Sequence, residues 1–313
     1  LVIGLLLLAY VVAKGWIGLK RAFIVGIVLF VAHVYWLLPF ARYALSNTDT
    51  YLNSKLNLVT TPDNGLKSVN YGGWDSLVFG KGFYFESLDI IDGDVMHSAP
   101  ILSDWENYWN QGSVRNVLAG VFVLAVLGLV SVFVELGWWK WGMMGGFLLS
   151  ASGLAISAWP ISYVGKSFHL ILIFEQAFRI GFTKLSILYV MFLAVFVAIG
   201  VEHIGRLLKK WGKLLVCVLV VIGMVYVALP IFKGNFIYKR MKVEVPKEYL
   251  SLIDFMKDRP KYARIATLPA QTYNGWMITD WGYTGSGFLF YGIEQPSLDR
   301  AFDVWSTYNE GFY

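Results

Sequence analysis

The feature that most constrains this chain is a series of long apolar stretches. A bilayer core about 30 Å thick requires about 20 mostly apolar residues in a helix that crosses it. The first 232 residues contain six such stretches, of which the first is short: Leu1–Ala13, Ala22–Phe40, Asn116–Leu136, Trp141–Pro160, Leu185–Val201 and Leu214–Phe232. The sequence therefore predicts a mainly α, polytopic α-helical integral membrane protein with six spans.

The composition excludes several classes of protein. Hydrophobic residues make up 57% of the chain, charged residues only 15%, and the mean hydropathy is +0.57. A soluble domain carries about 25% charged residues, so a soluble core, a disordered segment and a nucleic-acid-binding domain are all excluded. We expect membrane lipid as a partner and no nucleic acid. The net charge of +5 is instead explained by basic residues that collect in cytoplasmic loops.

The two ends and the cysteine content add further expectations. The chain starts within an apolar stretch at Leu1 and stops within an aromatic-rich stretch at Tyr313. We therefore expect an internal fragment of a longer protein, with its first helix and its last domain truncated. Cys217 is the single cysteine of the sequence, which excludes an intrachain disulfide and a cysteine-based metal site.

Small residues recur in the fourth apolar stretch. Gly142, Gly146 and Ser150 follow one another at intervals of four residues. This spacing places them on one helix face and allows a second helix to approach closely. We therefore predict that this helix is buried among its neighbours.

Basic residues predict the orientation of the spans. Lys or Arg side chains occur at 14–21, at Lys140 and at 206–213, in connecting segments that alternate along the chain. Cytoplasmic loops are enriched in these residues. The prediction is a plasma-membrane protein with membrane helices at 1–40 and 116–232, and with 41–115, 161–184 and 233–313 on the extracytoplasmic side.

Two of the extracytoplasmic segments are long enough to hold structure. The segment 41–115 forms a long loop with nine acidic and five basic residues. In the tail, Pro246 starts a predicted helix whose apolar face has the helical spacing of Tyr249, Leu252, Ile253 and Met256. A short strand is predicted from Arg264 to its end at Pro269. We expect residues 233–313 to form a small extracytoplasmic α/β domain.

An acidic pair in the long loop is the first candidate site. Asp92 and Asp94 are separated by one glycine. Two carboxylates at this spacing can share a divalent cation such as Mg²⁺ or Mn²⁺ and thereby hold a sugar-phosphate donor, and a carboxylate can also deprotonate an acceptor hydroxyl. The alternative is a solvated Asp-Gly turn without a function.

A charged segment before the fifth span is the second candidate. Arg179 and Lys184 occur in an otherwise apolar stretch, and a guanidinium is well suited to grip a lipid-linked phosphate. Alternatively, the stretch is an interfacial helix whose basic side chains extend to the headgroups, or Arg179 pairs with Glu175 four residues earlier.

Aromatic residues of the tail are the third candidate. Flat aromatic faces beside carboxylates suit sugar rings, which offer C–H faces and hydroxyls. The alternative is the packed aromatic core of a small domain. The residues expected to contact sugar are Trp276, Trp281, Tyr283 and Trp305.

Two segments of the sequence resemble a known family. The run Phe178–Lys184, which leads into a span, and the run from Tyr249 through the strand 264–269 into a Gly-aromatic stretch resemble the polytopic GT-C glycosyltransferases. The nearest similarity is to arabinofuranosyltransferase-like large membrane proteins of bacteria and archaea, over about Phe168–Tyr313.

The resemblance implies transfer of a sugar from a polyprenyl-phosphate carrier to an envelope glycan or glycoconjugate on the extracytoplasmic face. In that family the signature carboxylates usually lie in the first outer loop, so they are expected upstream of Leu1 rather than at Asp92 and Asp94. Two other functions remain open at this point. One is a transporter or flippase of lipid-linked glycans, and the other is a non-catalytic scaffold subunit of an envelope-assembly complex.

Overall fold

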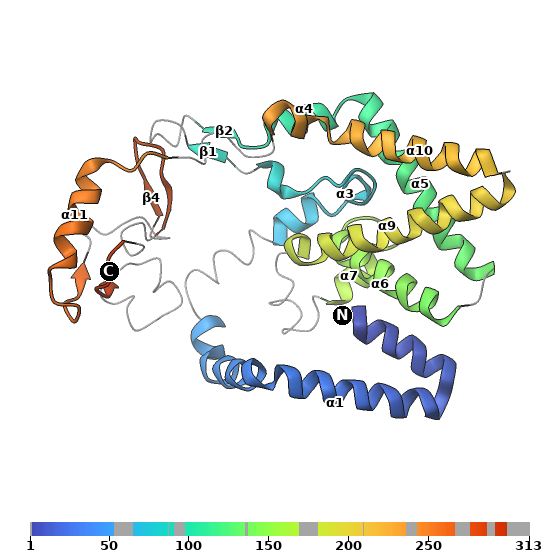
Figure 1. Cartoon of the computed structure of the whole chain (residues 1–313), viewed down its shortest axis with the longest axis horizontal. Helices are drawn as coiled ribbons and strands as arrows, with labels where there is room; N and C mark the ends of the chain where they lie inside the picture. Colours follow the sequence, from blue (N-terminus) through green and yellow to red (C-terminus); the bar gives the residue numbers. More distant parts are fainter. Residues whose placement is uncertain are drawn as a thin grey trace. The chain divides into compact units, whose positions relative to one another are not determined.

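The computed structural model describes residues 2–52, 65–86, 88–90, 98–134, 137–168, 181–208, 210–235, 243–266, 276–286 and 292–298 (Figure 1). The chain divides into two compact units. The first, here called the helical unit, contains Leu1–Pro39, Asn64–Tyr84 and Asp104–Phe236. The second unit contains Phe40–Asp63, Phe85–Ser103 and Ile237–Tyr313. The predicted site residues Asp92, Asp94, Arg179 and Trp305 lie outside the described residues.

The described part of the chain is mainly α-helical and contains four helices that are long and apolar enough to cross a membrane: Leu6–Asp49, Gly112–Val134, Gly181–Leu207 and Trp211–Asn235. The first of them includes two of the predicted spans in a single element, α1 (Val2–Leu52). These helices confirm the prediction of a mainly α membrane protein.

Gly15 breaks α1 into two helical stretches. Its backbone has φ 56° and ψ −133°, a conformation outside the helical region. Glycine has no Cβ and adopts positive φ without a steric penalty. Across this kink, Arg21 Nη1 donates a hydrogen bond of 2.8 Å to the hydroxyl of Tyr10. The break falls between the first two predicted spans, in the segment 14–21 whose basic residues separate the two apolar stretches.

The fourth predicted span is shorter than expected. Helix α6 (Trp138–Leu154) has 17 residues, whereas the prediction placed the end of this span at Pro160. After Leu154 the chain turns, and the backbone N–H of Ser157 donates to the carbonyl of Gly72, 3.0 Å away. A Cβ at Gly72 would lie 2.6 Å from the carbonyl oxygen of Ser68, so the contact requires glycine there. Helix α6 therefore falls short of the ~20 residues that span a bilayer.

Helices α5 (Gly112–Val134) and α9 (Gly181–Leu207) form the closest helix pair of the helical unit. A Cβ added at Gly128 of α5 would lie 1.9 Å from the carbonyl oxygen of Phe196, and one at Gly200 of α9 would lie 2.1 Å from that of Leu124. The two backbones therefore touch directly. Small residues at a helix crossing favour such packing in membranes, where association depends on van der Waals contact.

The small-residue face of α6 that the sequence predicts packs against two helices, with Gly142 beside Leu6 of α1 and Gly146 beside α9. Gly142, Gly146 and Ser150 are all buried. A Cβ at Gly146 would lie 2.2 Å from the ring of Phe192, which is 1% exposed. The prediction that this face is buried is confirmed.

Aromatic side chains fill the interior between α5, α6 and α9. Phe147 stacks on Tyr189 with ring centroids 5.4 Å apart and meets Phe196 edge-on at the same distance. The Tyr189 hydroxyl donates a 2.7 Å hydrogen bond to the carbonyl of Leu77. This bond satisfies a buried polar group and ties α3 (Trp74–Phe79) to the core.

Further elements complete the helical unit. They include a helical turn at residues 65–70, the first half of the 3₁₀ helix η1 (Phe83–Glu86), most of α4 (Ser103–Trp109), then α7 (Ser162–Phe168), α10 (Lys210–Val227) and the π-helical turn η2 (Ile231–Asn235). Figure 1 shows α10 beside α5 and α9, and contacts join all three. Two tyrosines help to join α4 to α10, because the hydroxyl of Tyr108 donates to the Tyr226 carbonyl at 2.7 Å.

A third tyrosine, Tyr84 of η1, is partly removed from solvent. Burial raises the pKa of the Tyr84 hydroxyl to about 12.

The described part of the second unit contains one helix of the tail and three strand pairs. Strand β1 (Leu88–Ile90) pairs antiparallel with β2 (Ser98–Pro100), and β4 (Trp276–Ile278) pairs antiparallel with β5 (Thr284–Ser286). Strand β3 (Ile265–Ala266) is parallel to β6 (Ser297–Leu298). Helix α11 (Lys247–Lys257) starts directly after Pro246, as predicted, and β3 lies within the predicted strand.

Gln295 fastens the end of α11 to the segment before β6. Its side chain is 4% exposed, and its Nε2 donates to the carbonyls of Met256 at 2.7 Å and Arg259 at 3.1 Å. The last carbonyls of a helix have no partner within the helix. The Gln295 amide supplies a donor at this helix end, which fixes α11 against the strand segment.

Candidate functional site

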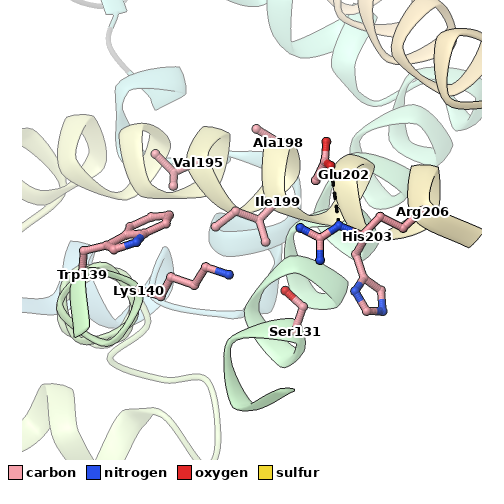
Figure 2. A pocket seen from close by; sticks show the side chains of 9 residues that line it. All are labelled: Ser131, Trp139, Lys140, Val195, Ala198, Ile199, Glu202, His203 and Arg206. Carbon is pink, nitrogen blue, oxygen red and sulfur yellow. Dashed lines mark ion pairs between the residues drawn. The ribbon is translucent and has the colours of Figure 1, made fainter. Parts of the chain in front are cut away.

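A polar pocket opens at one end of the helical unit, where three helices meet. It has a volume of about 430 Å³ and lies where α5 ends, α6 begins and α9 ends. Figure 2 shows the side chains that line it. They are Ser131 from α5, Trp139 and Lys140 from α6, and Val195, Ala198, Ile199, Glu202, His203 and Arg206 from α9.

The lining of this pocket is divided between polar and apolar side chains along α9. Val195, Ala198 and Ile199 form an apolar wall, and His203 and Arg206 follow one to two turns later. In Figure 2 the ammonium of Lys140 and the guanidinium of Arg206 extend toward each other from α6 and α9. The pocket therefore has an apolar side and a side with the basic side chains Lys140, His203 and Arg206.

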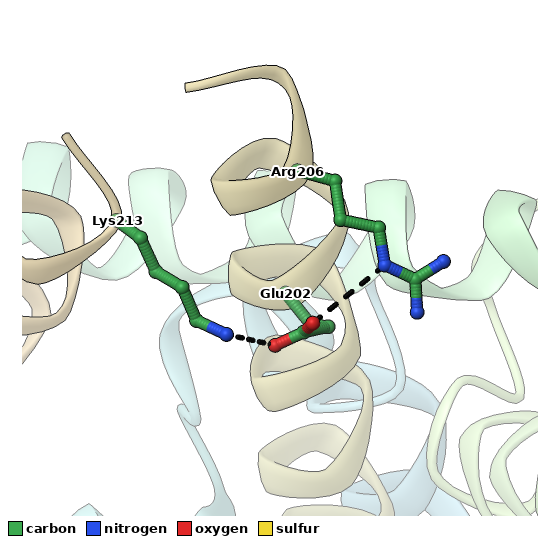
Figure 3. Close-up of polar contacts among 3 residues, drawn as sticks. All are labelled: Glu202, Arg206 and Lys213. Atoms are coloured by element: carbon green, nitrogen blue, oxygen red, sulfur yellow. Dashed lines mark hydrogen bonds and ion pairs between the residues drawn. The ribbon is translucent and has the colours of Figure 1, made fainter. Parts of the chain in front are cut away.

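Glu202 organises the basic side chains at the end of α9. Its carboxylate pairs with Lys213 at the start of α10, and Arg206 Nε lies 3.6 Å from its Oε1 (Figure 3). The Arg206 pair joins residues four apart on one helix, a spacing that brings side chains together. The Glu202 side chain is 46% exposed, so this network contributes little to stability. It places the Glu202 carboxylate between Lys213 and Arg206.

A second cluster is the aromatic hairpin of the second unit, here defined as β4, β5 and the turn between them. Trp281 and Tyr283 stack nearly in parallel, with ring centroids 5.6 Å apart and an angle of 20° between the planes. Tyr249 of α11 lies 5.6 Å from Trp281 at an angle of 56°. Trp281 and Tyr283 are both half-buried, and Asp280 beside them is exposed. The hairpin presents aromatic surface next to a carboxylate.

The turn of this hairpin is held by local hydrogen bonds. The backbone N–H of Tyr283 donates to the Thr279 hydroxyl oxygen at 2.9 Å, and the N–H of Gly282 donates to the Thr279 carbonyl at 3.2 Å. Gly282 has φ 93°, the positive φ that a short hairpin loop needs at its last position. These hydrogen bonds hold the backbone of the turn that contains Trp281 and Tyr283.

The structure places only some of the predicted site residues. Trp276 lies in β4, where its Cα pairs with Ser286 of β5, and Trp281 and Tyr283 follow in the same hairpin. Lys184 is exposed in the first turn of α9, at the other end of that helix from His203 and Arg206. Among the described residues, no group of three or more His, Cys, Asp or Glu side chains could hold a metal ion. The expectation of Mg²⁺ or Mn²⁺ rests on Asp92 and Asp94, which are not among those residues.

The polar pocket is not predicted from the sequence. Its charged residues Glu202 and Arg206, and Lys213 beside them, lie near helix ends, where basic residues predict orientation. The available signal was the spacing of Glu202, His203 and Arg206, which are close on one helical surface. Lys140 lines the same pocket only because α6 packs against α9, and the local sequence does not predict this packing.

Comparisons with known proteins give no relative for this chain. No protein-family model, no curated protein and no solved structure matches it.

Proposed function

We propose that this protein is a membrane glycosyltransferase of the GT-C type, which moves a sugar from a polyprenyl-phosphate carrier to an envelope glycan or glycoconjugate on the extracytoplasmic face of the plasma membrane. The observation that carries the proposal is the aromatic hairpin of the second unit. A pair of stacked rings beside an exposed carboxylate suits a glycan, because sugar C–H faces pack on aromatic rings while carboxylates accept bonds from hydroxyls.

The four apolar helices support a lipid-linked donor, since a polyprenyl chain must remain in the bilayer while its sugar reacts. In the proposed reaction the acceptor hydroxyl oxygen attacks the anomeric carbon of the donor sugar. The bond from that carbon to the phosphate oxygen breaks, and the polyprenyl phosphate leaves. A carboxylate takes the proton of the hydroxyl. Asp92 or Asp94 would supply it, and Arg179 and Lys184 would hold the phosphate.

The buried polar groups of the helical unit favour a transferase over a flippase. A transporter needs a polar path through the middle of the bilayer. In the described residues of α5 and α6, Ser131, Ser150 and Ser152 are buried, and their hydroxyls donate to carbonyls of their own helices at 2.7–2.9 Å. The interior between the helices is filled by the aromatic side chains Phe147, Tyr189, Phe192 and Phe196.

The test is sugar transfer by membranes that contain the full-length protein. Radiolabel should move from a polyprenyl-phosphate sugar to an envelope glycan, and the double change Asp92→Asn with Asp94→Asn should lower the rate if this pair acts as the base. Asp104→Asn is the matched control, because Asp104 is an exposed carboxylate of the same outer stretch. Failure of transfer across a panel of carriers and acceptors would contradict the proposed function.

The extracytoplasmic location is tested separately by thiol labelling in intact cells. In a Cys217→Ser background, Tyr262→Cys should react with a membrane-impermeant reagent, because Tyr262 is 87% exposed in the second unit. Leu207→Cys, at a site 79% exposed beside the basic segment 206–213, should react only after the membrane is opened. The reverse pattern would invert the orientation and remove the sugar-binding hairpin from the outer face.

A further inference from the structure

We propose that the pocket between α5, α6 and α9 binds the phosphate headgroup of an anionic phospholipid. Its lining includes no residue of the aromatic hairpin, and Lys184 lies at the other end of α9. It is defined by Lys140, Ser131, His203 and Arg206 at the polar side and by the wall of Val195, Ala198 and Ile199.

The charges that line the pocket favour an anion. Lys140 and Arg206 line it from two helices and His203 adds an imidazole, while Glu202 is the one carboxylate among the described residues of the lining. Glu202 is paired with Lys213 and with the Nε edge of Arg206. A guanidinium is a planar fork of donors whose geometry matches two oxygens of a phosphate. Ser131 also lines the pocket, but its hydroxyl donates to the carbonyl of Gly128 in its own helix.

The position along α9 favours a phospholipid over a soluble anion. Helix α9 has 27 residues, about 40 Å at 1.5 Å per residue, and exceeds a hydrocarbon core of about 30 Å. Its last turns, with His203 and Arg206, therefore reach the headgroup layer. Val195, Ala198 and Ile199 stand one to three turns deeper, at the level of acyl chains. Free phosphate would contact the polar side alone, while a phospholipid contacts both.

The surroundings of the pocket are those of a membrane interface. Trp139 is 40% exposed and lines the pocket, and the Lys140 Nζ lies 5.7 Å from the centre of its ring. Tryptophan is enriched at the headgroup level, and basic pockets between membrane helices bind anionic headgroups. The volume of about 430 Å³ is in the range of sites that hold small organic ligands.

The experiment measures lipid binding by the full chain, purified in a neutral detergent, with native mass spectrometry and thermal melting. Phosphatidylglycerol, phosphatidylcholine, polyprenyl phosphate and inorganic phosphate are titrated separately. We expect phosphatidylglycerol to bind at least tenfold more tightly than phosphatidylcholine and to raise the melting temperature. The double variant Lys140→Gln with Arg206→Gln should weaken phosphatidylglycerol binding by about tenfold or more, because each lost bond to phosphate costs about tenfold.

Lys20→Gln is the matched control. The Lys20 Nζ lies 5.5 Å from the centre of the Trp16 ring, a geometry close to that of Lys140 over Trp139, but Lys20 does not line the pocket. This variant should bind phosphatidylglycerol as the wild type does. The charge-preserving pair Lys140→Arg with Arg206→Lys keeps the proposal testable if the double glutamine variant fails to fold, since it should retain preference for the anionic lipid over phosphatidylcholine.

Three results would overturn the proposal. The first is equal binding of phosphatidylglycerol by the folded glutamine variant and the wild type. The second is equal stabilisation by phosphatidylcholine, which would mean that the acyl chains alone are recognised. The third is a different preferred ligand, shown either by equal stabilisation with inorganic phosphate or by tighter binding of polyprenyl phosphate. None of these results depends on sugar transfer.

Discussion

Replacing Gly128 or Gly200 with alanine should destabilise the helical unit more than any other single-methyl change in α5 or α9. The added Cβ would lie 1.9 Å from the Phe196 carbonyl oxygen in the first variant and 2.1 Å from the Leu124 carbonyl oxygen in the second. Both contacts involve backbone atoms, which cannot rotate away as a side chain can. Overpacking of this kind costs about 1–3 kcal/mol and sometimes more. The melting temperature of the detergent-purified protein should fall clearly in both variants.

Gly120→Ala is the control for this prediction, because Gly120 lies on the same helix α5 with no atom within 4 Å of an added Cβ. Alanine has a higher helix propensity than glycine by about 1 kcal/mol in a helix interior. This variant should therefore melt at the same temperature as the wild type or above it. Equal melting of the Gly120, Gly128 and Gly200 variants would contradict the close contact between α5 and α9.

From its long apolar stretches the chain could be recognised as a mainly α membrane protein, because length and hydropathy are local properties of the sequence. The small-residue spacing also predicted the buried face of α6 correctly, since Gly142, Gly146 and Ser150 share one side of any helix that includes them. The early end of α6 at Leu154 could not be predicted in this way. It depends on a contact between Ser157 and Gly72, which are remote in sequence.

The two candidate sites also differ in how far the local sequence predicts them. Trp281 and Tyr283 could be selected from the sequence because the alternation of glycine and aromatic residues in a short hairpin brings them together locally. The polar pocket requires Lys140 of α6 and Arg206 of α9 to line the same space. Helix packing brings the two side chains to one pocket. A basic residue near a helix end looks the same in sequence whether it faces a pocket or the headgroups.

Trp281→Ala should lower the apparent affinity for the acceptor glycan by about tenfold or more if the aromatic hairpin contacts sugar. The indole supplies the flat face that stacks with Tyr283 and approaches Tyr249. Loss of a central aromatic contact commonly costs 2 kcal/mol or more, and about 1.4 kcal/mol corresponds to tenfold. The measurement is the dependence of sugar transfer on acceptor concentration, and the effect should appear mainly in KM.

Two further variants separate sugar binding from the packing of the second unit. Trp281→Phe retains a flat aromatic face and should recover most of the affinity, whereas Trp211→Ala removes a tryptophan that is 77% exposed on α10 and should change nothing. Limited proteolysis reports whether the hairpin is still folded in Trp281→Ala. Weak acceptor binding together with wild-type protease resistance supports direct contact with the glycan. If the weakened binding appears only in variants that are also cleaved faster, Trp281 acts as the core of a small unit and the sugar-binding role of the hairpin is wrong.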